Sequence, residues 1–358
     1  MQTKVTKINF NGQNIYIGID VHLKSWTVTI MIENIIFKTF SMDPSPEILA
    51  NYVQKNFPGG NYYAAYEAGF CGFSVQREIE HLGIHCIVVN PADIPTKDKE
   101  KKQKEDKRDS RKLAKSLHSG DLEGIYIPSK KMEELRGLIR YRKTLVKEIC
   151  RHKCRIKAYL HLNGIRIPEN LNNASQHWSG KFTEWLKTVR LTTQYGDIVL
   201  NETLDTTEHL RNKLLKINRQ LRIINKDSEH SGILKFIQTV PGIGLIMAIT
   251  LIAELDNLLR FKSLDKLCSF IGLVPSTNSS GEKERTGSIT SRANSSLRSN
   301  IVECAWISIR NDPALAYSYN ELCKRMKSNE AIIRIAKKLL SRIRYVVKNE
   351  TEYVQSVI

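Results

Sequence analysis

The chain has 358 residues, and its 55 Lys and Arg against 37 Asp and Glu give a formal net charge of +18. Hydrophobic residues make up 41% of it, enough to bury the cores of two or three domains, which excludes a disordered tail or a collagen-like chain. The longest apolar stretch, Leu245 to Ala253, is too short to span a membrane. The positive charge favours a polyanionic partner, and nucleic acid is the first candidate.

The cellular compartment is indicated by the N-terminus and the cysteines. The opening residues, MQTKVTKINF, lack the apolar core of a secretory signal. Seven Cys at scattered spacing are typical of reduced thiols rather than of a disulfide framework. We therefore expect a cytoplasmic protein.

The first ninety residues alternate between strand and helix patterns. Strands are predicted over 16–19, 27–32, 35–40, 62–66 and 84–89, and helices over 46–56 and 73–81. The spacing of the first three strands suits an antiparallel meander. The whole order predicts a mixed sheet with helices packed on it, an α/β layer fold.

The composition changes abruptly over 96–115, where ten residues are Lys or Arg and five are Asp or Glu. The first part of this segment is predicted as a solvated basic loop and 105–118 as a helix. Beyond it, 132–162 has apolar residues at three- and four-residue steps and is predicted as one long helix. A second amphipathic stretch covers 204–224, so the pair indicates a helical hairpin or coiled coil. Two interpretations stay open, an internal bundle or a basic strut for dimerisation or nucleic acid.

Four carboxylates are placed where they could share a site. Asp20 closes the first strand and Glu67 closes a later one, while Asp106 and Asp109 lie three residues apart on one helical face. Hard oxygen ligands of this kind can hold a pair of Mg²⁺ ions that clamp a phosphodiester. Taken singly, the same residues are explained as turn formers or surface ion-pair partners. His22 could assist metal or phosphate, or be an ordinary loop histidine.

The last third, from about Gly232, is predicted to be helical apart from a Ser/Gly-rich interruption over 275–296. The turn that contains Gly242 and Gly244 lies between helical patterns over 233–239 and 245–255. That arrangement is typical of a helix–hairpin–helix, in which backbone N–H groups approach a phosphate. A tight turn between packed helices is the alternative.

A second chemical pattern is the turn predicted at 278–281, which carries Ser279 and Ser280. A serine among arginines can attack a phosphodiester, because guanidinium groups stabilise the developing charge. A flexible Ser-rich loop is the alternative. The residues expected to contact nucleic acid are Gly242, Gly244, Lys283, Arg285, Arg292 and Arg298.

As a set, the motifs resemble those of the Piv/MooV-related DEDD insertion-sequence transposases, the IS one-ten family. The motifs that carry the resemblance are GIDVHLK, AYEAG, KEDKRDSRKLA, VPGIG, RFKSLDKLCSFIGLVPS, SSGEKERTGSIT and NSSLR. They follow in the expected order from about residue 15 to residue 310.

The resemblance implies a fold of class α/β plus α. It comprises a RuvC-like (RNase H) mixed-sheet domain over 1–128, a helical coiled-coil linker over 129–230, a mainly helical transposase domain over 231–345, and a tail over 346–358. It also implies that Asp20, Glu67, Asp106 and Asp109 hold Mg²⁺, for which Mn²⁺ could substitute, and that Ser280 is the nucleophile, with Ser279 in reserve.

The partners implied are DNA of the element ends and target, a structured bridge RNA that guides the reaction, and further copies of the chain in a dimer or tetramer. The location implied is the nucleoid of a prokaryote. Two positions depart from the usual pattern, Ser110 where Ala is common and Ala293 where Gly is common. Two other functions stay open, a RuvC-like Holliday-junction endonuclease and a non-catalytic nucleic-acid-binding protein.

Overall fold

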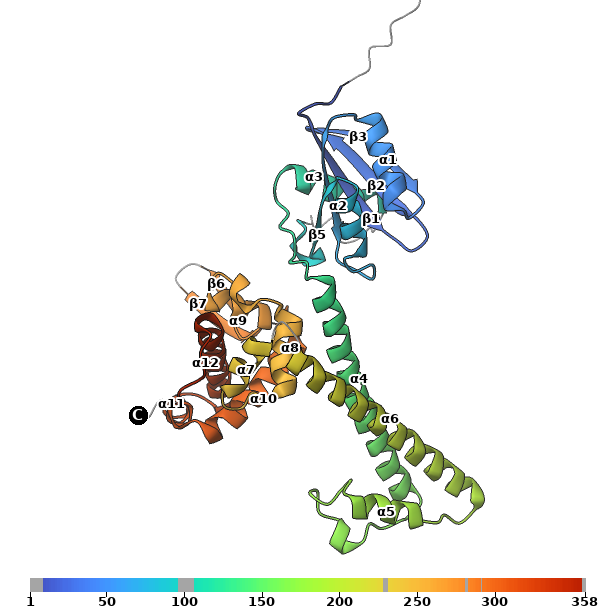
Figure 1. Cartoon of the computed structure of the whole chain (residues 1–358), viewed down its shortest axis with the longest axis vertical. Helices are drawn as coiled ribbons and strands as arrows, with labels where there is room; N and C mark the ends of the chain where they lie inside the picture. The colour runs from blue at the N-terminus through green and yellow to red at the C-terminus, as the bar shows by residue number, and fades with distance from the viewer. Residues whose placement is uncertain (1–8, 96–105, 228–230, 281–282, 291, 356–358) are drawn as a thin grey trace, which may run out of the picture. The chain divides into compact units, whose positions relative to one another are not determined.

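The computed structural model describes residues 9–95, 106–227, 231–280, 283–290 and 292–355. Its contacts group into two compact units, Met1–Ile127 and Pro128–Ile358. The first is built on a mixed β-sheet, and the second is mostly helical (Figure 1). Among the described residues, no helix combines the length and apolarity required for a membrane crossing.

The sheet of the first unit has five strands in the order β3-β2-β1-β4-β5. The strands are β1 Asn14–Val21, β2 Trp26–Ile32, β3 Ile35–Met42, β4 Asn61–Glu67 and β5 His85–Val89. The first three pair antiparallel, whereas β4 and β5 run parallel to β1 and to each other. The predicted meander and mixed sheet are therefore confirmed, and the topology is consistent with a RuvC-like domain.

Helices cover both faces of this sheet. Because side chains alternate along a strand, Ile15, Ile17 and Ile19 of β1 point to one face, where all three are fully buried. There they share a core with residues of α1 (Pro46–Asn56) and α2 (Ser74–His81). The short 3-10 helix η1, Pro91–Asp93, follows β5.

Helix α3, Asp106–His118, packs on the opposite face and runs antiparallel to β1. Its last residue, His118, contacts the ring of Tyr16 at a centroid distance of 5.0 Å. Near its middle the helix passes directly over Gly18, where an added Cβ would lie 2.5 Å from the Ala114 nitrogen and closer still to the Ser110 carbonyl oxygen. Gly18 therefore allows the close approach that places the N-terminus of α3 at the end of β1.

The second unit begins with two long helices that pack along one another, α4 (Lys130–Leu162) and α6 (Gln194–Asp227). Figure 1 shows the shorter helix α5, Gly180–Thr188, beside the end of α4. The 3-10 helix η3, Glu169–Leu171, precedes α5. The predicted helical hairpin is confirmed, although α6 begins ten residues earlier than the apolar pattern indicated.

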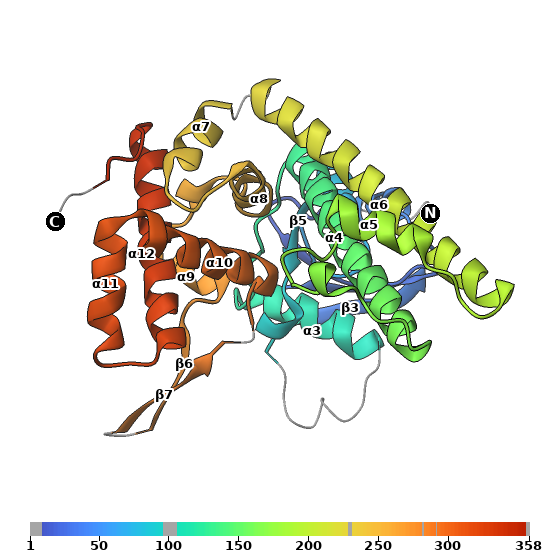
Figure 2. The same ribbon diagram turned by 90° about the horizontal axis from the view of Figure 1, so that it is seen from below.

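The rest of the second unit surrounds one large apolar core. Its helices are α7 Ser231–Thr239, α8 Leu245–Leu255, η4 Leu258–Arg260, α9 Leu264–Ile271, α10 Ser295–Asn311, α11 Pro313–Cys323 and α12 Ser328–Asn349. Two strands, β6 Pro275–Ser280 and β7 Lys283–Ile289, pair antiparallel and extend from these helices as a ribbon (Figure 2).

The ribbon corrects two predictions. The Ser/Gly-rich interruption is a β-hairpin rather than a loop, and residues 278–280 belong to a strand instead of a turn. The polar sequence has no apolar alternation, which is the usual strand signal. Pairing of the two backbones does not need that alternation, because the ladder forms between N–H and C=O groups.

Candidate active site

Two of the four carboxylates lie at the same edge of the sheet. The parallel pairing of β1 with β4 ends at Ile19 opposite Tyr66. Asp20 and Glu67 are the next residues of these two strands, at the carboxyl ends that neighbouring parallel strands share. Both belong to the face of the sheet that α3 covers, because Gly18 and Ala65 pair two residues earlier. The topology thus places Asp20 and Glu67 at neighbouring strand ends.

The N-terminus of α3 adds Asp106 to this edge, and the residue after β1 adds His22. The His22 Nε2 atom lies 3.2 Å from Asp20 Oδ2 and 3.7 Å from Asp106 Oδ1. One ligand atom from each of the three residues lies within 4.8 Å of the other two. The Asp20 side chain is 19% exposed, whereas His22 and Asp106 are 45% and 56% exposed, so the cluster opens to solvent.

Charge accumulates around Asp20. Burial raises the pKa of its carboxyl above the ordinary value, His22 lowers it, and the negative charges of Asp106 and Asp109 raise it further. Asp109 is therefore close enough to act electrostatically on Asp20, although it is not among the three clustered ligands. Several carboxylates close to one another repel unless a cation lies among them. The electrostatics thus fit a site that binds a cation.

These residues offer a reasonable donor set for a divalent metal. Carboxylate oxygens suit Mg²⁺ and Mn²⁺, and a neutral imidazole nitrogen is a further ligand for transition ions. Asp20, His22 and Asp106 would hold the ion, with Glu67 at the adjoining strand end and Asp109 one turn along α3. The geometry therefore assigns His22 to the cluster, a residue that the sequence left as either a loop histidine or an assistant.

A chain of hydroxyl groups fixes α3 on the sheet. Ser110 is fully buried and lies 2.9 Å from the Thr29 hydroxyl, which in turn lies 3.0 Å from that of Thr39. Arg111 donates from Nε to the same Thr39 oxygen over 3.0 Å. Ser110, which stands where Ala is common in the family that the sequence resembles, therefore has a buried hydrogen-bond partner on β2, Thr29. The sequence did not reveal this contact, because it joins residues 81 positions apart.

The predicted nucleophiles lie in the second unit, on β6. The backbone of Ser280 pairs with Lys283 and that of Ser279 with Glu284. The side chains of both serines and of Lys283 and Arg285 lie outside the described part of the structure, as does Gly281. The location of the two serines on a paired strand is what the structure adds, and their chemical roles stay predictions.

The base of this hairpin is fixed by Arg298, which donates to the carbonyl of Gly272 over 3.2 Å and to that of Thr290 over 2.8 Å. These carbonyls lie on either side of the ribbon, so the guanidinium ties its two ends to α10. Arg292, in contrast, is exposed just after β7. Contact of either arginine with nucleic acid stays a prediction.

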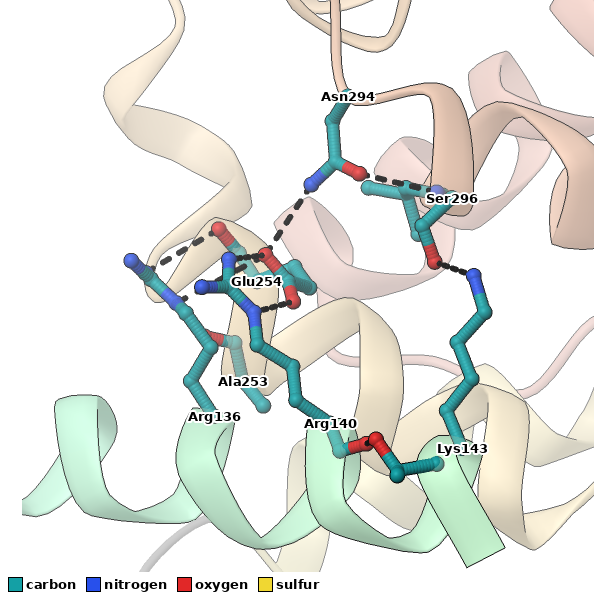
Figure 3. Close-up of polar contacts among 9 residues, drawn as sticks. Arg136, Arg140, Lys143, Ala253, Glu254, Asn294 and Ser296 are labelled. Atoms are coloured by element: carbon teal, nitrogen blue, oxygen red, sulfur yellow. Dashed lines mark hydrogen bonds and ion pairs between the residues drawn. The ribbon is translucent and has the colours of Figure 1, made fainter. Parts of the chain in front are cut away.

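A polar network extends this anchor to α4 (Figure 3). Glu254 is almost buried on α8 and accepts two hydrogen bonds of 2.9 Å from Arg140. Asn294 donates to the same carboxylate over 3.1 Å while its Oδ1 caps α10 by accepting from the Leu297 amide. Arg136 completes the contact with bonds to the carbonyls of residues 253 and 254. Beside this network, Lys143 bonds to the Ser296 hydroxyl.

The two glycines of the predicted phosphate-binding turn differ in their surroundings. Gly242 has a φ of +87° and packs against α10, where an added Cβ would lie 2.5 Å from Ser308 Oγ and 2.6 Å from the Cys304 carbonyl. Gly244 precedes α8 with no atom within 4 Å of such a Cβ. The structure thus gives Gly242 a packing role and leaves Gly244 open, while their contact with nucleic acid stays a prediction.

Two family models match the chain in succession. One, for DEDD transposases of the IS110 type and described as "Transposase", covers residues 17–165. The other, described as "Transposase IS116/IS110/IS902 family", covers residues 234–320. Both matching models describe transposases of the IS110/IS116/IS902 kind, and together they cover most of the chain. The first match spans all four predicted carboxylates, and the second spans the hairpin and both glycines.

Individual proteins that are similar to this chain carry the same kind of name. The y4qE protein of Sinorhizobium fredii (strain NBRC 101917 / NGR234), named as a transposase, is 30% identical over 247 residues, 68% of this chain and 58% of that protein. The transposase for insertion sequence element IS1533 of Leptospira borgpetersenii is 22% identical over 68% of this chain and 70% of its own length. This chain thus spans somewhat more than half of y4qE.

Proposed function

We propose that this chain moves an insertion sequence by cutting and exchanging DNA strands, with the acidic cluster around Asp20 as the metal site and Ser280 as the nucleophile. The observation that carries the proposal is the cluster itself, three ligand atoms within 4.8 Å at a sheet edge that also holds Glu67. A cation held by these carboxylates would remove their repulsion of phosphate, so the cluster fits a phosphodiester substrate. The net charge of +18 suits a DNA partner.

The acidic cluster and Ser280 have different roles in the proposed reaction. Asp20, His22 and Asp106 would hold a divalent metal, which would supply Lewis-acid stabilisation of charge on the leaving oxygen. The Ser280 oxygen attacks phosphorus and loses its proton, the bond from phosphorus to the leaving sugar oxygen breaks, and that oxygen takes up a proton. In the second step a hydroxyl of the partner strand attacks the same phosphorus and loses its proton, the bond from phosphorus to the Ser280 oxygen breaks, and that oxygen takes up a proton. The phosphodiester count is conserved, so no external energy source is needed.

The test is a covalent adduct. Wild-type protein with element-end DNA and Mg²⁺ should give a protein–DNA species that survives denaturing gel electrophoresis. Ser280→Ala should abolish it while keeping DNA binding, and Ser279→Ala should keep it. Strand exchange at the wild-type rate by Ser280→Ala would contradict the assignment of Ser280 as nucleophile. If only Ser279→Ala loses the covalent adduct, Ser279 is the nucleophile.

The acidic cluster is tested separately by Asp20→Asn. We expect this variant to lose metal-dependent cleavage and keep its overall fold. Cleavage without an adduct in wild type would indicate a Holliday-junction-type endonuclease that uses water. Salt-sensitive binding with no cleavage at all would indicate a non-catalytic nucleic-acid-binding protein.

We also propose two kinds of partner. The resemblance to RNA-guided members supports a structured bridge RNA encoded by the same element, with base pairing supplying the sequence choice. Purification of the chain from cells that carry its whole element, followed by sequencing of the bound RNA, should recover one discrete RNA; scattered cellular RNA would contradict this. A dimer or tetramer is supported by the long α4–α6 hairpin, on which Leu215 and Ile223 are half exposed, and light scattering of the purified protein would measure it.

A further inference from the structure

We propose that His22 is a direct ligand of the metal in the acidic cluster, and that its nitrogen makes the site prefer Mn²⁺ to Mg²⁺. The proposal rests on the proposed function, because it concerns the same metal. It goes beyond the four carboxylates of the family signature, which contain no nitrogen donor.

The first argument is the direction of the side chain. His22 follows β1 directly, two residues after Asp20, and residues two apart in an extended chain point to the same face. That face is the one on which α3 packs, and α3 contributes Asp106. The histidine is therefore directed to the same point in space as two carboxylates from two separate elements, α3 and β1.

The second argument is the spacing of the ligand atoms. An ion with metal–ligand bonds of about 2.1 Å separates neighbouring ligands by about 3.0 Å and opposite ligands by about 4.2 Å. The His22 nitrogen lies 3.2 Å from the Asp20 oxygen and 3.7 Å from the Asp106 oxygen. Both separations fall within this range. An ordinary ion pair needs only one carboxylate, whereas the ring nitrogen here faces two.

The third argument is chemical. Mg²⁺ takes oxygen ligands and keeps much of its water, whereas an imidazole nitrogen suits transition ions. Two carboxylates with one imidazole form a mixed set that Mn²⁺ accepts more readily than Mg²⁺ does. The exposure of His22 and Asp106 leaves the remaining coordination positions open to water or to a phosphate oxygen.

The chain offers a matched control in His85. Its Nδ1 atom lies 3.2 Å from Glu80 Oε1, the same separation as in the His22–Asp20 pair. Within the described residues, His85 has no second carboxylate within 4 Å. His85→Gln therefore removes an equally close histidine–carboxylate pair outside the cluster.

The experiment uses the full-length protein, Mn²⁺ and Mg²⁺ alone, and no DNA. Pulsed electron paramagnetic resonance of the Mn²⁺-loaded wild type should show hyperfine coupling to a histidine nitrogen. His22→Gln should lose this coupling and raise the Mn²⁺ dissociation constant about tenfold or more, since loss of even an outer partner costs about tenfold. The Mg²⁺ dissociation constant should change less, so the Mn²⁺ preference falls. His85→Gln should behave as wild type.

Two outcomes overturn the inference. If wild type shows no nitrogen coupling, or if His22→Gln keeps both the coupling and the affinity, His22 is not a ligand. Asp20→Asn separates this failure from failure of the proposed function. If that variant binds Mn²⁺ as wild type does, the metal lies elsewhere and both proposals fall, whereas loss of binding in Asp20→Asn with unchanged binding in His22→Gln removes only the histidine.

Discussion

The acidic cluster and the serine hairpin are supported in different ways. The acidic cluster is fixed by packing within the first unit. Gly18 allows α3 to lie close to the sheet, and the buried Ser110–Thr29 contact joins α3 to β2, so that Asp106 lies at the end of β1. The described contacts of the hairpin are concentrated at its base, where Arg298 bonds to the backbone on both sides and Asn294 links α10 to Glu254.

This difference suits the two tasks proposed for them. A metal site needs ligand atoms held within a few tenths of an ångström, which packing against a sheet provides. A nucleophile that becomes joined to DNA and is later released has to move with the DNA strand, and a ribbon anchored only at its base allows this movement. Substitutions in the two supports should therefore have separable effects, one on metal binding and the other on adduct formation.

The largest effect is expected from Gly18→Ala. The new Cβ would overlap the backbone of α3 at Ser110 and Ala114, which a side-chain rotation cannot relieve. We expect a loss of about 3 kcal/mol or more in the free energy of unfolding of the first unit, together with loss of Mn²⁺ binding. Urea unfolding and metal titration measure the two effects. Gly137→Ala, at a helical site with no atom within 4 Å, is the control and should stabilise by up to about 1 kcal/mol.

Glu254→Ala should weaken the contacts that anchor the base of the serine hairpin. It leaves Arg136, which is mostly buried, without its carboxylate and removes the acceptor to which the Asn294 amide donates. Because Arg140 is largely exposed, we expect a cost of about 2 kcal/mol rather than the full cost of a broken buried pair. Adduct formation should fall while Mn²⁺ affinity stays constant. Glu148→Ala, which breaks an ion pair with the exposed Arg151, is the control and should cost about 0.5 kcal/mol or less. An equal loss of unfolding free energy in the two variants would contradict a special role for Glu254.

Local sequence patterns predicted most of the elements and the strand-end positions of Asp20 and Glu67. Asp20 and Glu67 could be found because each ends a strand, and strand ends are visible in alternation and turn residues. The role of His22 was left open and the Ser110–Thr29 contact could not be found, since both depend on how α3 crosses the sheet. The hairpin was missed for another reason, because its polar residues form a ladder through backbone groups that carry no side-chain pattern.

The glycine pair of the turn before α8 gives a smaller and more specific test. Gly242→Ala has to adopt a φ of +87° and to displace Ser308, so we expect it to cost about 2 kcal/mol of stability. Gly244→Ala meets no neighbouring atom and should keep wild-type stability. If the turn contacts phosphate, Gly244→Ala should weaken DNA binding in a filter assay. Unchanged DNA affinity in this stable variant would leave the turn with a packing role only.

The smallest effect concerns the hydroxyl pair under the acidic cluster. Ser110→Ala leaves Thr29 its bond to Thr39, and Thr29→Val leaves Ser110 a weaker contact to the Lys107 carbonyl, so each should cost about 1 kcal/mol. The double variant should cost less than the sum, because both single variants lose the same Ser110–Thr29 hydrogen bond, which the double variant loses only once. A double-mutant cycle in urea measures this coupling, and Mn²⁺ affinity measured on the same proteins shows its consequence for Asp106. Additive costs with unchanged affinity would mean that Gly18 and the apolar contacts of α3 suffice to hold the acidic helix in place.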